Sequence, residues 1–131
     1  MRTVGFLLVS AVTACSTPQT NAVPVPVEVW LGADVGLALR MRDKLEQVIP
    51  KRRDFRLAGS GQGLFQIYIN GNADEVSTHR YRLYVDFYRG LPGDRQKIGE
   101  SRPVCLEHQM SQCASVVLVD ARRMAARLGH P

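Results

Sequence analysis

The chain has 131 residues, of which 45% are hydrophobic, and its 17 lysines and arginines outnumber its 12 acidic residues to give a net charge of +5. This length allows one domain with a modest core. The charge is too mildly basic for a nucleic-acid binder and better suits phosphate-bearing lipid or glycan surfaces.

The first fifteen residues have the layout of a secretory signal. Arg2 precedes an apolar run over residues 4–12, which is too short to cross a bilayer as a permanent helix, and small residues then lead to Cys15. The segment Val12-Thr13-Ala14-Cys15 resembles the lipobox of bacterial lipoproteins. This resemblance implies that signal peptidase II removes residues 1–14 and that Cys15 carries the lipid, palmitate included. Ser16 replaces the aspartate of inner-membrane retention signals, which implies the periplasmic face of the outer membrane.

The remaining chain divides into a tether and one domain. Residues 15–26 form the lipidated N-terminus and a polar, proline-containing tether, because they offer little to bury. Residues 27–131 form a single periplasmic domain.

Two cysteines remain once Cys15 is assigned to the lipid. In an oxidising periplasm the pair Cys105 and Cys113 predicts a disulfide. A zinc site would use Cys105, His108 and Cys113, but a fourth ligand is not evident and a disulfide removes two ligands at once. We therefore predict no metal and no cofactor.

Apolar periodicity predicts two helices. The first covers residues 35–49, with Asp34 as its N-cap and Pro50 at its end. The second runs from a cap at Ser111 to residue 128 and ends at Gly129. Each helix has a single apolar stripe, made by Val35, Ala38, Met41, Leu45, Val48 and Ile49 in the first and by Val117, Ala121, Met124 and Leu128 in the second.

Alternating segments predict the strands. Residues 23–31 form a strand that becomes regular after Pro26 and can lie at a sheet edge. A short strand begins at Phe55, and the glycine-rich residues 59–63 form a turn. Half-buried strands follow at residues 64–70 and 81–88, joined by a polar loop over residues 71–79. After a turn at residues 91–94, another strand covers residues 97–106, weakened by Pro103.

These elements predict an α+β fold. It is a two-layer sandwich with the order β-α-β-β-β-α, in which both helices pack on one face of a mostly antiparallel sheet. The short strand at Phe55 and one near Val104 leave the strand count open. A lipobox, a tether and this order over residues 27–128 resemble small outer-membrane accessory lipoproteins such as LptE, and more loosely the curli-pore and TolB N-terminal-type domains. The resemblance implies a helper of a larger envelope machine, but it assigns no functional residue.

Two surfaces are candidates for binding. Arg82, Tyr84 and Tyr88 point to one side of an alternating strand and predict a surface for a protein partner, although cross-strand pairing alone could also explain them. The densest basic cluster predicts an anion-binding patch, with a solvated helix end as the alternative. Its members are Lys51, Arg52, Arg53 and Arg56.

Catalytic patterns are weak. The three histidines lie in a polar loop, a turn and the chain end, without a nucleophile elbow, and Asp74, Glu75 and Asp86 do not form a carboxylate pair. We therefore expect a non-enzymatic accessory protein that binds an envelope assembly or secretion partner. A binder of anionic lipopolysaccharide or peptidoglycan is the second hypothesis, and a small periplasmic enzyme is the third.

Overall fold

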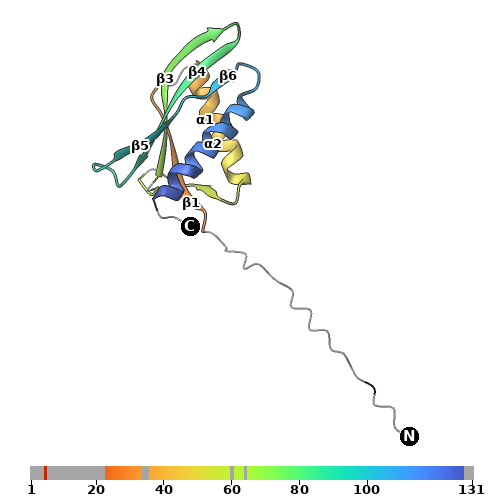
Figure 1. Cartoon of the computed structure of the whole chain (residues 1–131). Coiled ribbons are helices and arrows are strands. Elements are labelled where there is room, and N and C mark those ends of the chain that lie inside the picture. The colour runs from red at the N-terminus through yellow and green to blue at the C-terminus, as the bar shows by residue number, and fades with distance from the viewer. Residues whose placement is uncertain (1–4, 6–22, 34–35, 60, 64, 129–131) are drawn as a thin grey trace.

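The computed structural model describes residues 23–33, 36–59, 61–63 and 65–128, together with Gly5, and it confirms the α+β fold class. Two helices lie beside a six-stranded sheet (Figure 1). Neither helix is long and apolar enough to span a bilayer. In chain order the elements are β1 (Val25–Leu31), α1 (Gly36–Val48), the 3-10 helix η1 (Ile49–Lys51), β2 (Phe55–Leu57), β3 (Phe65–Ser77), β4 (Arg80–Arg89), β5 (Gln96–Ser101), β6 (Val104–Leu106) and α2 (Met110–Arg127).

The strand order in the sheet is β2-β1-β3-β4-β5, and β6 also pairs with β4. β1 runs parallel to β2 and β3, whereas the remaining pairs are antiparallel. The predicted edge position of β1 is therefore wrong. The Val25 N–H donates to the Asp54 carbonyl and the Ala58 N–H donates to the Val27 carbonyl, so these two valines bond toward β2. The backbone nitrogen of Pro26, which has no hydrogen, therefore faces β3. Among the described residues, pairing with β3 starts at Val27, the residue after this proline.

Both helices cover the same face of the sheet (Figure 1). The strands direct alternate apolar side chains to this face, and the helices contribute their predicted stripes to one continuous core. Its largest fully buried apolar side chains are Phe65, Phe87, Met41, Leu45, Ile49, Ile67, Ile69, Leu83, Leu118, Val27 and Val85.

The segment predicted as a polar loop, residues 71–79, is mostly strand. β3 continues to Ser77 and β4 starts at Arg80, and the register shifts between Ile69 and Ala73. Polar side chains suit this part of the hairpin because it extends past the core and is exposed on both faces. Its polar composition therefore reflects solvent exposure rather than a loop conformation.

The last strand and the start of the last helix also differ from the prediction. Residues 97–106 divide into β5 and β6, because Pro103 cannot donate to a ladder. The N-cap of α2 is Gln109 and has no side-chain hydrogen bond, so the predicted cap at Ser111 is wrong. The order is thus β-α-β-β-β-β-β-α, apart from η1. The expected caps Asp34 and Gly129 and the predicted helix residue Val35 lie outside the described residues, as do Cys15 and residues 16–22 of the tether. Of the signal only Gly5 is described. The last two residues assigned to the tether, Val25 and Pro26, belong to β1.

Candidate binding site on the open face of the sheet

The face of the sheet opposite the helices, here called the open face, is not covered by any described helix. β1 and β3 each place a polar residue and then an aromatic residue on this face. Because the two strands are parallel and in register, Glu28 lies beside Gln66 and Trp30 lies beside Tyr68. The pairing therefore builds one polar row and one aromatic row.

Glu28 is only 3% exposed although it lies on the open face. The Gly61 N–H donates to its Oε1 atom, and an Nη atom of Arg95 lies 3.4 Å from its Oε2 atom. Gly63 packs so closely that an added Cβ would lie 2.8 Å from Glu28 Cγ. The glycine-rich turn predicted from the sequence thus closes over the carboxylate, which retains hydrogen-bond donors despite its burial.

The side-chain amide of Gln66 is held in one orientation. Its Nε2 atom donates to the Gly63 carbonyl at 2.6 Å and the Gly90 carbonyl at 3.1 Å, and it lies 3.3 Å from a Glu28 oxygen. Three acceptors around one atom identify that atom as the nitrogen. Gln66 is 1% exposed, and its Oε1 atom finds no hydrogen-bond partner among the described residues. A buried acceptor of this kind costs about 1–3 kcal/mol when it stays unpaired.

Aromatic side chains surround this amide. The guanidinium of Arg95 lies 4.5 Å from the centre of the Trp30 ring, and the rings of Tyr68 and Tyr88 meet edge to face at 6.2 Å. These four side chains and Gln66 line a pocket of about 220 Å³, here called the aromatic pocket. Drug-sized ligands occupy pockets of roughly 300 Å³ or more, so this one suits a single side chain or small group.

The three residues of the predicted partner surface are separated in the structure. Tyr88 forms a wall of the aromatic pocket. Tyr84 donates a hydrogen bond to Asp74, which raises the pKa of the phenol, and its ring lies 4.9 Å from the guanidinium of Arg102. Arg82 is exposed and lies two residues nearer the hairpin turn than Tyr84. Tyr84 and Tyr88 therefore line different pockets. Tyr84 lies beside a hollow of about 440 Å³ with Asn70, Asn72, Ala73 and Asp74, and Tyr88 lines the aromatic pocket.

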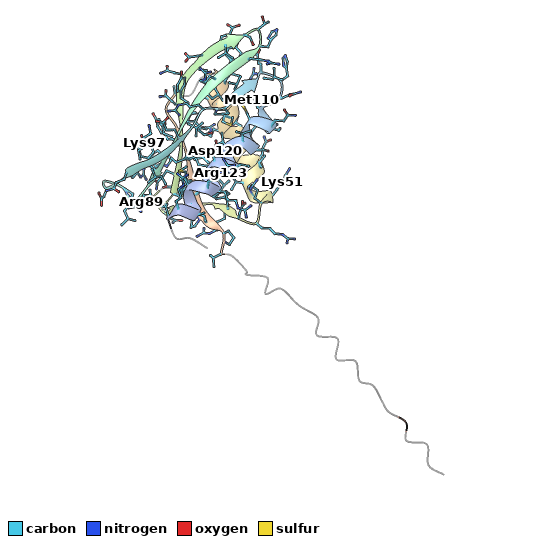
Figure 2. The ribbon with its side chains drawn as sticks, viewed as in Figure 1. Lys51, Arg89, Lys97, Met110, Asp120 and Arg123 are labelled. Carbon is cyan, nitrogen blue, oxygen red and sulfur yellow. A yellow bond between two sulfur atoms is a disulfide. The ribbon has the colours of Figure 1, made fainter. Side chains whose placement is uncertain are left out.

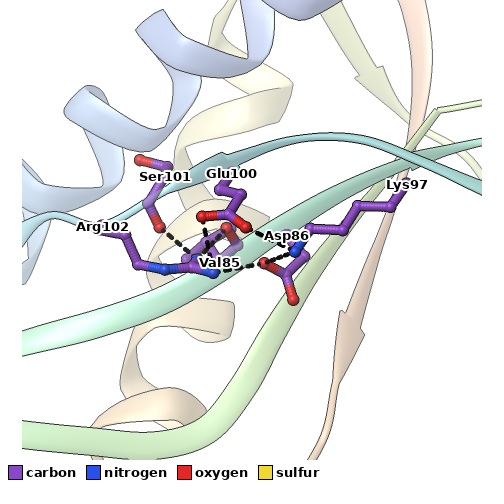
Figure 3. A network of polar contacts seen from close by, with 6 residues as sticks. All are labelled: Val85, Asp86, Lys97, Glu100, Ser101 and Arg102. Carbon is purple, nitrogen blue, oxygen red and sulfur yellow. Dashed lines mark hydrogen bonds and ion pairs between the residues drawn. The ribbon is translucent and has the colours of Figure 1, made fainter.

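A network of charged side chains surrounds Asp86 of β4 (Figure 3). In sequence, Asp86 lies between Tyr84 and Tyr88. Arg102 approaches Asp86 to 2.9 Å and Glu100 to 3.2 Å, and it donates to the Val85 carbonyl at 2.8 Å. Lys97 lies 2.7 Å from Glu100 and 3.4 Å from Asp86. The hydrogen bond from Lys97 holds the pKa of Glu100 below its ordinary value and raises that of Lys97. Two cations balance two anions, so the network stabilises the sheet rather than attracting an ion.

The basic cluster is only partly free to bind an anion. Arg52 makes a two-pronged contact with Asp54, with N···O distances of 2.8 and 2.7 Å, and this hydrogen bonding lowers the pKa of Asp54. Lys51, Arg53 and Arg56 are exposed. They lie at the end of the sheet where β1 begins, because the Val25 N–H donates to the Asp54 carbonyl and β2 pairs with β1 there (Figures 1 and 2).

Most of the aromatic pocket was not among the predicted site residues. Of its lining residues only Tyr88 was named as a candidate, and the others are Trp30, Gln66, Tyr68 and Arg95. A usable signal was present in the matching spacing Glu28-x-Trp30 and Gln66-x-Tyr68, which places each polar residue on the same face as an aromatic residue. Local periodicity does not show that these strands are neighbours, and that fact depends on the parallel pairing.

Comparison with known proteins leaves the family open. No protein-family model matches the chain, and no curated protein sequence matches it. Among solved structures, the chain is similar to a protein from Caulobacter crescentus described as a "putative lipoprotein". The two are 11% identical, the match covers 79% of this chain and 90% of the other, and the TM-score is 0.45. A likeness this distant carries no argument about function, which must come from the residues themselves.

Proposed function

We propose that this chain is a lipid-anchored, non-enzymatic lipoprotein of the outer membrane that binds a protein partner of an envelope assembly or secretion system through its open face. The lipobox-like segment ending at Cys15 supports the anchor. The open face supports the binding role, because it combines aromatic rings with buried polar groups.

The observation that carries the proposal is the aromatic pocket, in which the rings of Trp30, Tyr68 and Tyr88 lie beside the buried amide of Gln66. These rings offer apolar surface, as in the central pockets that dominate binding energy at protein interfaces. Among the described residues the Oε1 atom of Gln66 has no hydrogen-bond partner, but less than 1 Å² of this atom is accessible, so a partner group would reach it only after a movement of the Gln66 side chain. A flat side chain that carries an N–H group, such as the amide of asparagine or glutamine, fits a pocket of this kind.

Copurification from the envelope of the host, followed by affinity measurement with the captured partner, tests this role. Tyr88→Ala removes a pocket wall and should weaken binding by about tenfold or more, which corresponds to about 1.4 kcal/mol. Val119→Ala is the matched control, because Val119 is an exposed apolar residue on α2. Tyr84→Ala shows whether the surface extends along β4. Full binding by a folded Tyr88→Ala variant would contradict the proposal, as would equal losses in Tyr88→Ala and Val119→Ala.

A second candidate is binding to anionic envelope material through Lys51, Arg53 and Arg56. It is favoured by their position at the end of the domain where β1 leaves the tether, which a lipid anchor would hold near the membrane. Affinity for anionic vesicles that falls with salt and is lost on changing the three residues to glutamine would support it. Arg52 stays unchanged in this variant because it pairs with Asp54. Partner capture that survives the triple change would favour the open face.

A further inference from the structure

Three side chains with metal-binding atoms meet beside the turn of the β3–β4 hairpin. His79 lies in that turn, and Glu107 and His108 follow β6. One ligand atom from each residue lies within 4.8 Å of the other two. His79 Nδ1 is 3.3 Å from a Glu107 oxygen, and the two imidazole rings are 5.8 Å apart between centres. The three residues thus converge although His79 is distant from the other two in sequence.

The backbone holds these residues in place independently of any ion. The Glu107 N–H donates to the His79 carbonyl at 2.9 Å, and the adjacent residues Arg80 and Leu106 are paired between β4 and β6. The Cys105–Cys113 disulfide joins the same segment to α2. His79 adopts φ = 60°, in the left-handed region that a non-glycine residue seldom occupies. Only the side chains would have to rotate to converge on an ion.

We propose that His79, Glu107 and His108 bind a divalent transition-metal ion of the zinc type. Two imidazole nitrogens and one carboxylate oxygen are a ligand set that zinc accepts, whereas calcium and magnesium prefer oxygen ligands alone. Zinc–ligand distances near 2.0–2.1 Å require two ligands of one ion to lie within about 4 Å of each other. The present spread of 4.8 Å would contract to this value by small rotations of the exposed His79 and His108 side chains and of the half-buried Glu107 side chain.

The other contacts of Glu107 do not explain the whole cluster. Arg40 approaches the Oε1 atom of Glu107 to 3.8 Å, and His79 approaches Oε2. Exposed ion pairs of this kind contribute little, so a metal ion can replace them at low cost. Neither pair accounts for His108 beside His79. With three protein ligands, the ion would keep an open position for water or a donor from a partner.

This site differs from the one weighed in the sequence. There, His108 was grouped with Cys105 and Cys113, but the two cysteines form the disulfide, with a Cα–Cα distance of 5.6 Å. The hairpin supplies His79 instead, and β6 continues into Glu107. The proposal therefore replaces the expectation that the chain holds no metal.

Calorimetric titration of the metal-free, detergent-solubilised protein with ZnCl₂ tests the site. We expect one ion per chain, with a Kd of about 10 µM or tighter. His79→Asn keeps a residue that tolerates the left-handed conformation, and this variant and His108→Gln should each weaken binding by about tenfold or more. Glu46→Gln is the control, because it removes an exposed carboxylate of α1 that does not belong to the cluster.

Visible absorption after Co²⁺ addition provides a second readout, because tetrahedral nitrogen and oxygen coordination differs from that of the hydrated ion. The proposal predicts that the Co²⁺ spectrum is lost in the His79→Asn and His108→Gln variants while far-ultraviolet circular dichroism shows that they remain folded. Zinc binding by the unmodified protein with a Kd weaker than about 10 µM would overturn it. Equal zinc affinity in the unmodified protein and a folded His79→Asn, His108→Gln double variant would overturn it as well.

Discussion

Arg52 and Asp54 illustrate how two half-buried side chains link stability to pH. Their two-pronged contact lowers the pKa of Asp54, chiefly through hydrogen bonds from Arg52. A lowered folded-state pKa means that the contribution to stability is complete above the unfolded-state pKa of about 3.9 and is lost as the pH falls through the folded-state value. The pair therefore stabilises the protein at neutral pH and not in strong acid.

We predict that Asp54→Asn lowers the free energy of unfolding by about 1 kcal/mol at neutral pH, because it removes one charge of a well-oriented pair. The difference from the unmodified protein should shrink as the pH falls below the unfolded-state pKa of about 3.9 and through the lower folded-state pKa, because Asp54 then becomes protonated in the folded protein as well. Urea unfolding at neutral pH and in acid measures the free energy of unfolding of the variant and of the unmodified protein. Asp43→Asn is the control, since its contact with Arg42 is exposed and should contribute almost nothing. A difference that grows in acid would contradict this explanation.

Glu28 and Gln66 show the limit of prediction for single residues. Strand alternation alone is enough to place both side chains on the face away from the core, together with Trp30 and Tyr68. It could not predict their burial, which depends on two distant segments, one around Gly61–Gly63 and the other at Arg95, that fold over the strand ends. The face of the strand to which a side chain points follows from the local sequence, whereas the burial of that side chain depends on the fold of the whole chain.

Helices were predictable at the scale of elements because a helix buries one stripe of its own sequence. Met41, Leu45, Val117 and Ala121 lie in the core as the three- and four-residue spacing predicted. The hairpin was predicted less well, because the polar residues 71–77 pair across strands outside the core, where no apolar alternation marks them. The parallel position of β1 between β2 and β3 also depends on pairing partners far away in sequence.

The disulfide connects two elements, β6 and α2, through buried cysteines, as the cysteine count predicted. Replacing both Cys105 and Cys113 by alanine should lower the free energy of unfolding by about 2–3 kcal/mol, because the short closed loop restricts the unfolded chain. Amide hydrogen exchange should accelerate most in the first turns of α2, which lose their covalent link to the sheet.

Ser115→Ala is the control for this change. Its hydroxyl donates to the Ser111 carbonyl on the exposed side of the same helix turn, so its loss should have an effect below about 0.5 kcal/mol. Unchanged stability in the double cysteine variant would show that the bridge is dispensable for folding. Uniform acceleration of exchange along α2 would show that it does not act locally on the first turns.

At the scale of the whole molecule, the two ends of the sheet differ in chemistry. Exposed lysine and arginine side chains lie where β1 begins, whereas His79, Glu107 and His108 lie beside the turn of the hairpin, at the opposite end (Figures 1 and 2). The aromatic pocket lies on the open face of the sheet, on residues of β1, β3 and β4. If Cys15 carries a lipid, we expect the basic end, where β1 begins, to lie nearer the membrane than the end with His79, Glu107 and His108.

That orientation depends on acylation of Cys15, which we predict from the residues before it. Mass spectrometry of the native N-terminus should show a cysteine carrying diacylglycerol, because the apolar run, the small residues and the cysteine match the requirements of lipoprotein processing. Several acyl chains, each contributing about 0.8 kcal/mol per buried CH₂ group, hold the protein to a bilayer more firmly than one chain could. Cys15→Ala should therefore leave the protein unprocessed or release it from the membrane fraction. The Cys105→Ala, Cys113→Ala variant is the matched control and should remain in that fraction, since its cysteines lie in the folded domain. A native N-terminus that starts after Cys15 without any lipid would exclude the anchor, and with it the assignment of the basic end to the membrane.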